Sequence, residues 1–237
     1  MLKTRFRISA KRLQGGFDAF AKRFDFLELP DPLPADSTLN RYRKEAPPHF
    51  DFCIPFPKAL APFKTGPELK KAVISTRKLV SSLRARIVRI ATPTSFTPSQ
   101  ANVERLEKLV GALNMDASTI VWEPSGLWEI PHAGYVASSL GIVLSVDPLH
   151  DPIPPGDICY LRFRALGESR RKPSDDVIAK VIRAVGNRRE AFVVVENDDA
   201  LSVAKSIRRS SQGGARVIGG FDRLIRPSHE GRSEEEE

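Results

Sequence analysis

The sequence predicts a (β/α)8 TIM-like barrel in which the helix after the sixth strand is irregular or missing. Eight short runs rich in β-branched and aromatic residues alternate with about seven segments whose apolar residues recur at helical spacing. No internal repeat, linker or shift in composition divides the 237 residues, a length that one large domain accommodates. Strict alternation predicts a parallel sheet, and eight units favour a closed barrel over an open doubly wound sheet.

Local signals set the limits of these elements. The expected strands cover residues 5–9, 25–29, 50–54, 86–91, 119–123, 142–146, 158–164 and 191–196. The expected helices cover residues 17–24, 37–45, 67–83, 100–113, 127–140, 174–186 and 199–210. Pro67 is a favoured first-turn residue, Ser174 is a good N-cap, and Gly141 ends a helix. Pro131 and Gly134 predict a broken helix, and the four prolines of residues 147–156 leave little room for the next one.

The charge is unevenly distributed along the chain. The whole chain has a net charge of +8. Residues 228–237 contain five acidic side chains and one basic side chain, so the remaining residues 1–227 have a net charge of +12. We expect one domain over residues 1–227, with a terminal strand or turn at 215–225, followed by a disordered acidic tail over 228–237. A basic body indicates nucleic acid or a phosphorylated ligand as partner, although solubility or stability could also require it.

Several classes of protein are not indicated. No run approaches the roughly 18 apolar residues of a membrane span, and the basic N-terminus lacks the apolar region of a signal peptide. Cys53 and Cys159 fit no metal-binding spacing, so we expect buried free thiols and a cytoplasmic location. The histidines lie in loops or beside prolines, and no Walker A, GxGxxG, GxSxG or HExxH motif occurs. No metal site or cofactor is therefore assigned.

The seventh expected strand carries two arginines on one face. Tyr160, Arg162 and Arg164 alternate with Leu161 and Phe163, and charge that faces an enclosed space needs a partner. In a TIM barrel the ligand site lies at the C-terminal ends of the strands. Further polar residues reach these ends on other strands, namely Glu28, Glu123, Asp147, Glu196 and Asn197. Carboxylates are therefore expected to gather at one rim beside two arginines.

Three interpretations of this rim remain open. The acids and arginines could form a structural network in a non-catalytic scaffold. Arg162 and Arg164 could instead hold a phosphate or carboxylate, which is the leading hypothesis. Glu28, Glu123 and Asp147 could alternatively be the catalytic residues of a metal- or acid/base-dependent hydrolase of phosphodiesters or sugars. Whether the protein is an enzyme is left open.

Weaker candidates surround this rim. Trp122 and Trp128 flank Glu123, and either core packing or stacking of a base or sugar would suit an aromatic residue there. The basic runs, among them residues 84–89, are expected on solvated helix faces or at helix ends. Residues 170–172 are the exception, because their loop leaves the seventh strand at the rim.

The order of several motifs is similar to that of a known family. FDFLELPDPLP, FDFCIPFPKAL, ATPTSF, VWEPSGLW, YLRFRALG and FVVVENDDALSVAKSI resemble the domain-of-unknown-function 72 (DUF72, YecE-like) family over residues 17–207. The resemblance implies a TIM barrel without an assigned reaction. It also implies that Glu28, Glu123, Arg162 and Asn197 match polar residues of the family.

The chain departs from this family at several matching positions. Pro55 stands where the family has a lysine, with Lys58 nearby, and Arg164 stands where it has a histidine. Ala91 and Pro124 replace a glutamine and an arginine. The resemblance therefore implies a ligand site at the rim whose ligand differs from the family's, or an ancestral activity that has been lost. Lys58, Trp128 and Asn197 complete the set of candidate ligand-binding residues.

Overall fold

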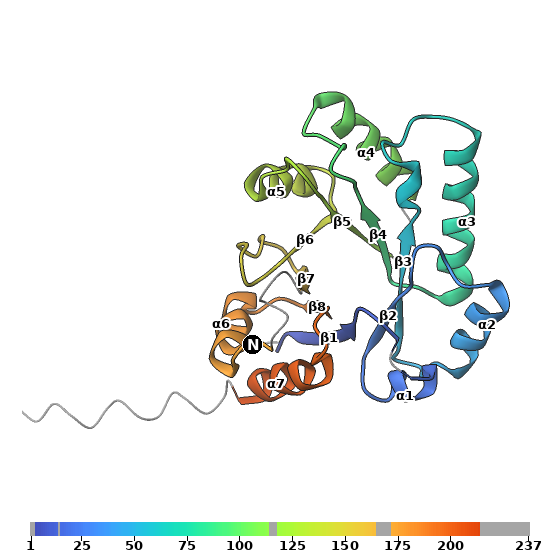
Figure 1. The fold of residues 1–237 in the computed structure, drawn as a ribbon. Coiled ribbons are helices and arrows are strands. Elements are labelled where there is room, and N and C mark those ends of the chain that lie inside the picture. Colours follow the sequence, from blue (N-terminus) through green and yellow to red (C-terminus); the bar gives the residue numbers. More distant parts are fainter. Residues whose placement is uncertain (1–2, 14, 114–117, 165–171, 214–237) are drawn as a thin grey trace, which may run out of the picture.

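The computed structural model describes residues 3–13, 15–113, 118–164 and 172–213, and it shows helices around a ring of strands (Figure 1). The strands are β1 (Arg5–Ala10), β2 (Phe26–Glu28), β3 (Asp51–Phe56), β4 (Ile87–Ala91), β5 (Thr119–Glu123), β6 (Val143–Val146), β7 (Ile158–Phe163) and β8 (Glu190–Val195). The helices are α1 (Phe17–Ala21), α2 (Asp36–Glu45), the short 3-10 helix η1 (Lys58–Leu60), α3 (Pro67–Leu83), α4 (Gln100–Leu113), α5 (Ile130–Ser139), α6 (Asp175–Val185) and α7 (Ala200–Gly213). The predicted TIM-like barrel is confirmed.

All strand pairs are parallel, in the order β1-β8-β7-β6-β5-β4-β3-β2. The ring is nearly closed, because β1 and β2 lie next to each other without a regular ladder. At this seam the backbone N–H of Asp25 donates to the carbonyl of Ile8 at 2.8 Å, and the Asp25 carboxylate accepts from the N–H of Ile8 at 2.9 Å. The side chain of Asp25 thus substitutes for a ladder acceptor.

The segment between β5 and β7 corrects one prediction and confirms another. Helix α5 is continuous rather than broken, because Pro131 occupies its first turn, where no intrahelical N–H is needed. Gly141 follows the helix with a φ of 66°, a left-handed conformation that glycine adopts readily. Residues 147–157 contain no helix, as the prolines predict. The outer side of β6 and β7 therefore lacks the helix that a complete barrel would have.

Two apolar clusters form the core. The larger lies between the strands and the helices and includes Ile8, Leu161 and Phe163. The smaller fills the interior of the barrel and consists of Phe26, Cys53, Ile87, Val121, Tyr160, Phe192 and Val194. Along β7 these two clusters receive alternate residues, so the predicted inward face of Tyr160 and Arg162 is confirmed.

Several expectations concern residues outside the described ranges. These are the arginines at 170 and 171, the strand or turn over 215–225, and the acidic tail over 228–237. Within the described ranges, no helix combines the length and the apolar character needed to cross a membrane.

Candidate functional site

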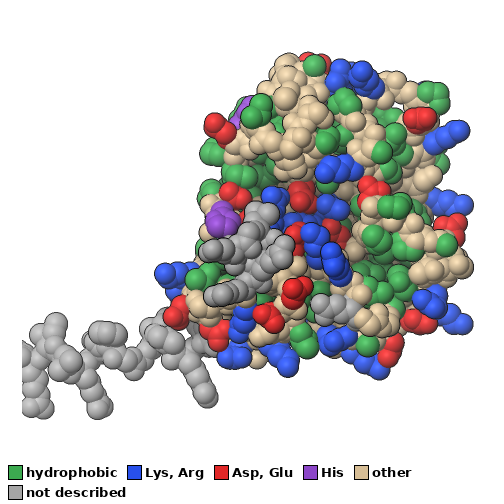
Figure 2. Space-filling model, in the orientation of Figure 1, with side chains coloured by type: hydrophobic (Ala, Val, Ile, Leu, Met, Phe, Trp, Pro, Cys, Tyr) green, Lys and Arg blue, Asp and Glu red, His purple; other side chains and the backbone are tan. Residues whose placement is uncertain are grey.

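Charged side chains form a layer above the apolar interior, at the C-terminal ends of the strands. We call this layer the rim cluster, and it consists of Lys11, Glu28, Arg89, Glu123, Arg162, Arg164 and Glu196. In the space-filling view, acidic and basic side chains meet near the centre of the face shown, and other Lys and Arg side chains are spread around its edge (Figure 2).

Arg162 is the centre of the rim cluster. Its side chain is only 4% exposed, and its Nη2 lies 2.6 Å from Oε2 and 2.8 Å from Oε1 of Glu28. Its Nη1 donates to Oε1 of Glu196 at 2.7 Å, and its Nε lies 3.4 Å from Oε2 of Glu123. A buried guanidinium is costly unless carboxylates surround it, so these contacts satisfy a requirement of the fold.

Arg89 is a second buried arginine that sequence reasoning missed. Its Nε lies 2.8 Å from Oε1 of Glu28, and its Nη1 donates to Oε2 of Glu123 at 2.8 Å. The prediction that residues 84–89 form a solvated basic run is wrong here, because Arg89 lies inside a strand and is mostly buried. The alternation of IVRIA contained the signal, since Ile87, Arg89 and Ala91 share the inward face.

Each rim glutamate is therefore committed to cations. The hydroxyl of Tyr160 also donates to Oε2 of Glu28 at 3.0 Å, and Nζ of Lys11 donates to Oε2 of Glu196 at 2.9 Å. Burial alone would raise the pKa of Glu123 and of Glu196. The neighbouring arginines, and Lys11 at Glu196, outweigh it and lower both values. Both glutamates are consequently held in the ionised form.

Arg164 is the least committed cation of the cluster. Its guanidinium makes one hydrogen bond among the described residues, from Nη2 to Oε1 of Glu123, and this bond is long at 3.4 Å. The side chain is 32% exposed, compared with 4% for Arg162. Because a guanidinium carries five N–H donors, most of those on Arg164 remain available to a ligand.

Two predicted residues, at the ends of the two strands that flank β7, have buried oxygens without a partner among the described residues. Asp147 follows β6 and accepts from the backbone N–H of Leu149 at 3.0 Å through Oδ1, whereas its Oδ2 accepts no hydrogen bond from the described residues. Burial raises the pKa of Asp147, and the N–H of Leu149, the charge of His150 and the backbone N–H and charge of Arg164 partly offset this effect. Asn197 follows β8 and is also buried, with an unpartnered Oδ1.

The two remaining predicted residues lie apart from the rim cluster. Lys58 begins η1 and is exposed, and its backbone N–H donates to the carboxylate of Asp31 at 3.0 Å. Trp128 is buried in the outer core, where its indole N–H donates to the carbonyl of Phe96 at 2.6 Å and its ring packs edge-on against Trp122. The structure therefore does not bring them together with Arg162 and Arg164 through any described contact.

A second ionic network lies at the opposite end of the barrel. Arg7 contacts Glu190 at 2.9 Å and Asp51 at 3.2 Å, and Arg86 contacts Glu190 at 2.7 Å and Asp51 at 3.3 Å. The two charges of each sign compensate one another. The apolar interior thus lies between two layers of paired charge, and the rim layer alone occupies the end at which TIM barrels bind ligands.

The charged residues do not resemble a metal site. Among the described residues, no three His, Cys, Asp or Glu side chains are grouped so that they could hold a metal ion. At the rim, arginines lie between the carboxylates and balance their negative charge, as a metal ion would in a metal site. In the described part of the rim, the carboxylates are therefore neutralised by arginines.

Comparison with known proteins supports the fold. No protein-family model matches the chain, and no curated protein matches its sequence. A DUF72 family protein from Enterococcus faecalis is similar in structure, with a TM-score of 0.66 and 12% identity over 87% of this chain and 95% of that chain. A D-tagatose 3-epimerase-like protein has a TM-score of 0.59 and 12% identity over 88% of this chain and 97% of its own.

The IolI protein, solved with a bound zinc atom, has a TM-score of 0.53 and 10% identity over 88% of this chain and 96% of its own. At such identities the likeness is one of fold. The expected resemblance to the DUF72 family is confirmed at that level, and the TIM barrel is common to these neighbours.

Proposed function

We propose that the protein binds a small phosphorylated or carboxylated ligand at the C-terminal rim of the barrel, with Arg164 as the main anchor. The observation that carries the proposal is that the arginines differ in how many carboxylates they contact. Arg162 and Arg89 are held by two or three carboxylates each, whereas Arg164 is partly exposed and has a single long hydrogen bond. Charge-assisted bonds from a guanidinium fork suit phosphate and carboxylate groups.

The other rim residues would assist this anchor. Lys11 is 52% exposed and can contribute a second positive charge. Asn197 and Asp147 offer acceptor atoms that no described protein group uses, and these atoms would suit hydroxyl groups of the ligand. Arg162, Glu28 and Glu123 would hold this arrangement rigid from below.

A small ligand agrees better with this geometry than a polymer does. Binding of a nucleic acid strand depends on a row of cations along its phosphates. Within the rim cluster, as far as the structure describes it, the accessible cations are Arg164 and Lys11, and the other basic side chains in view are spread around the edge of the face (Figure 2). The net charge of +8 therefore serves to attract anions over a distance rather than to specify a polymer.

The hydrolase alternative has less support. Glu28 and Glu123 each contact two or more arginines. The lowered pKa of Glu123 makes this residue a poor proton donor near neutral pH. We therefore assign no catalytic step to Glu28, Glu123 or Asp147. Their proposed role is to position the arginines and the ligand.

Calorimetric titration at low and high salt tests the proposal. The probes are pyrophosphate, a hexose 6-phosphate, neutral D-tagatose, and short DNA and RNA strands. We expect the phosphorylated probes to bind and Arg164→Gln to weaken their binding by roughly 10-fold or more, as for the loss of a charged hydrogen bond. The control Arg209→Gln, on an arginine that is 71% exposed on α7, should leave binding unchanged.

Two results would contradict the proposal. One is equal binding by the Arg164→Gln and Arg209→Gln variants. The other is binding of nucleic acid alone, with a steep salt dependence that Arg164→Gln does not alter.

A further inference from the structure

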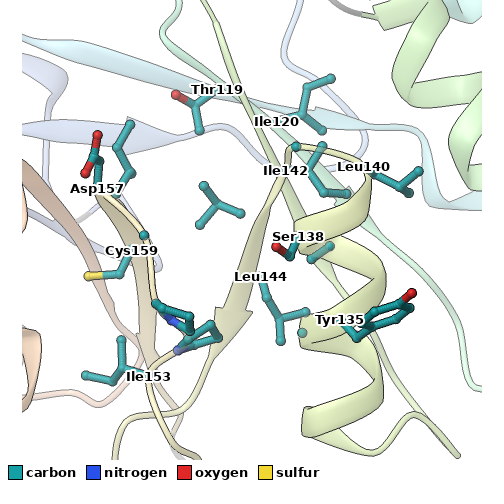
Figure 3. A pocket seen from close by; sticks show the side chains of 18 of the residues that line it. Thr119, Ile120, Tyr135, Ser138, Leu140, Ile142, Leu144, Ile153, Asp157 and Cys159 are labelled. Carbon is teal, nitrogen blue, oxygen red and sulfur yellow. The ribbon is translucent and has the colours of Figure 1, made fainter.

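A groove of about 980 Å³ lies on the outer side of β6 and β7, where a complete barrel would have a helix. Figure 3 shows Tyr135 of α5 along one side, Cys159 of β7 along the other, and Leu144 of β6 between them. Residues 152–156 form a further edge. Apolar side chains prevail in the lining, so the groove is suited to contact with another apolar surface.

Helix α5, which borders the groove, carries no charged side chain. No Asp, Glu, Lys or Arg occurs in residues 130–146, whereas each of α2, α3, α4, α6 and α7 contains at least three of them. The helix is not enclosed by the rest of the described molecule, because the side chain of Tyr135 is 74% exposed. A helix face in water normally carries charged residues, and the cores of protein interfaces are depleted of them. The outer side of α5 therefore has the charge composition of an interface.

Lysine and arginine are absent from a longer stretch of the chain on this side of the barrel. Residues 109–161 contain neither, although the whole chain has 37 in 237 residues, a frequency that would give about eight in such a stretch. The described groove residues include one cation, Arg189, and one acid, Asp157. Because each molecule has a net charge of +8, two copies repel one another wherever their cations face each other. The side of α5 and β6 avoids this repulsion and is suited to contact with a second copy.

A projecting side chain and a hollow lie next to each other on this surface. Tyr135 and Leu127, at 74% and 72%, are the most exposed large apolar side chains among the described residues. Tyr135 lies at the border of the groove, and Leu127 precedes α5. A two-fold contact pairs the same surface on both copies, so that the Tyr135 of each copy faces the groove of the other. Pockets of this volume hold drug-sized molecules, so a tyrosine ring fits.

We propose that α5 and the groove beside it form the interface of a two-fold dimer of this protein. In this dimer, Tyr135 of each copy binds in the groove of the other copy and covers β6 and β7 in place of the missing helix. Tyrosine is among the residues that contribute most to the binding energy of such interfaces. The dimer concerns the outer wall of the barrel, so it is independent of ligand binding at the rim.

Sedimentation equilibrium of the full-length protein tests this proposal at concentrations between about 1 and 100 μM. We expect a monomer–dimer equilibrium, and Tyr135→Arg should raise its dissociation constant by at least about 10-fold, because it removes an aromatic anchor and adds a charge. The matched control is Ile74→Arg, which adds the same charge at a 67% exposed apolar residue of α3 and should leave the dissociation constant unchanged. A monomer at all concentrations, or equal dissociation constants for the two variants, would overturn the proposal.

Salt dependence provides a second readout. Raising the salt concentration from about 50 to 500 mM should leave the dimer as tight or make it tighter, because salt screens the repulsion between two molecules of net charge +8. A dimer that weakens steeply with salt would depend on ion pairs and would contradict an uncharged interface. A crystal structure in which a small molecule or another part of the same chain fills the groove would also overturn the proposal.

Discussion

Replacing Arg162 by methionine tests whether the rim cluster is a connected ionic layer. The side chain is 4% exposed and contacts Glu28, Glu123 and Glu196, so its removal leaves buried carboxylates with fewer cations. Breaking a buried ion pair on one side costs about 3–5 kcal/mol. For a domain of this size, each kcal/mol lowers Tm by about 2–4 °C, so we expect a decrease of roughly 6–20 °C.

Urea unfolding measures this loss through the fluorescence of Trp122 and Trp128, both of which are buried. Arg162→Lys should lose less stability, because it keeps the charge without the guanidinium fork. The control Arg209→Met affects an arginine that is 71% exposed and should cost less than about 1 kcal/mol. If Arg162→Met were as stable as Arg209→Met, the ionic layer would not contribute to stability in the way that its contacts indicate.

Three further predictions concern a buried hydroxyl, a rim glutamate and the two cysteines. Tyr160→Phe removes a hydroxyl that donates to Glu28 at 3.0 Å, and should lower the free energy of unfolding by about 1–3 kcal/mol in urea, whereas Tyr135→Phe at an exposed site should not. The pKa of Glu196 is lowered from 4.5, so the ionised carboxylate stabilises the fold fully above about pH 4.5, and this contribution is lost as the pH falls further. In urea unfolding measured at several pH values, Glu196→Gln should therefore show a smaller decrease in the free energy of unfolding between neutral and acidic pH. Burial raises the pKa of Cys53 to about 12 and of Cys159 to about 11, so iodoacetamide at pH near 8 should label both thiols slowly, by mass spectrometry, until urea unfolds the protein. Equal stability of the two tyrosine variants would contradict the first prediction. The second would be contradicted if Glu196→Gln lost as much stability in acid as the unmodified protein, and the third if iodoacetamide labelled the cysteines of the folded protein rapidly.

The sequence was informative wherever a local pattern decides the structure. Period-two alternation identified the inward face of β7, and the prolines of residues 147–156 predicted the missing helix. The same rule applied to β4 would have found Arg89. Its position within a basic run of residues 84–89 concealed it, because such runs usually lie on solvated helices.

Pairing across the barrel could not be predicted in the same way. Glu28 and Arg162 are 134 residues apart in sequence, and they meet because both β2 and β7 direct these side chains into the interior of the ring. Arg7 and Glu190 are 183 residues apart in sequence, and they meet because β1 pairs with β8. Periodicity gives the face of each strand, whereas the partner of a charge depends on strand order, register and side-chain length together. That Arg162 is paired with three glutamates, and Arg164 with only one among the described residues, could therefore be seen only in the structure.

The position of a bound phosphate group tests the central claim most directly. In a crystal structure of the protein grown with pyrophosphate, we expect phosphate oxygens about 2.7–2.9 Å from the guanidinium of Arg164, with Arg162 still paired to Glu28. Pyrophosphate bound away from Arg164, or bound to Arg162 with its contact to Glu28 broken, would contradict the assignment of Arg164 as the anchor.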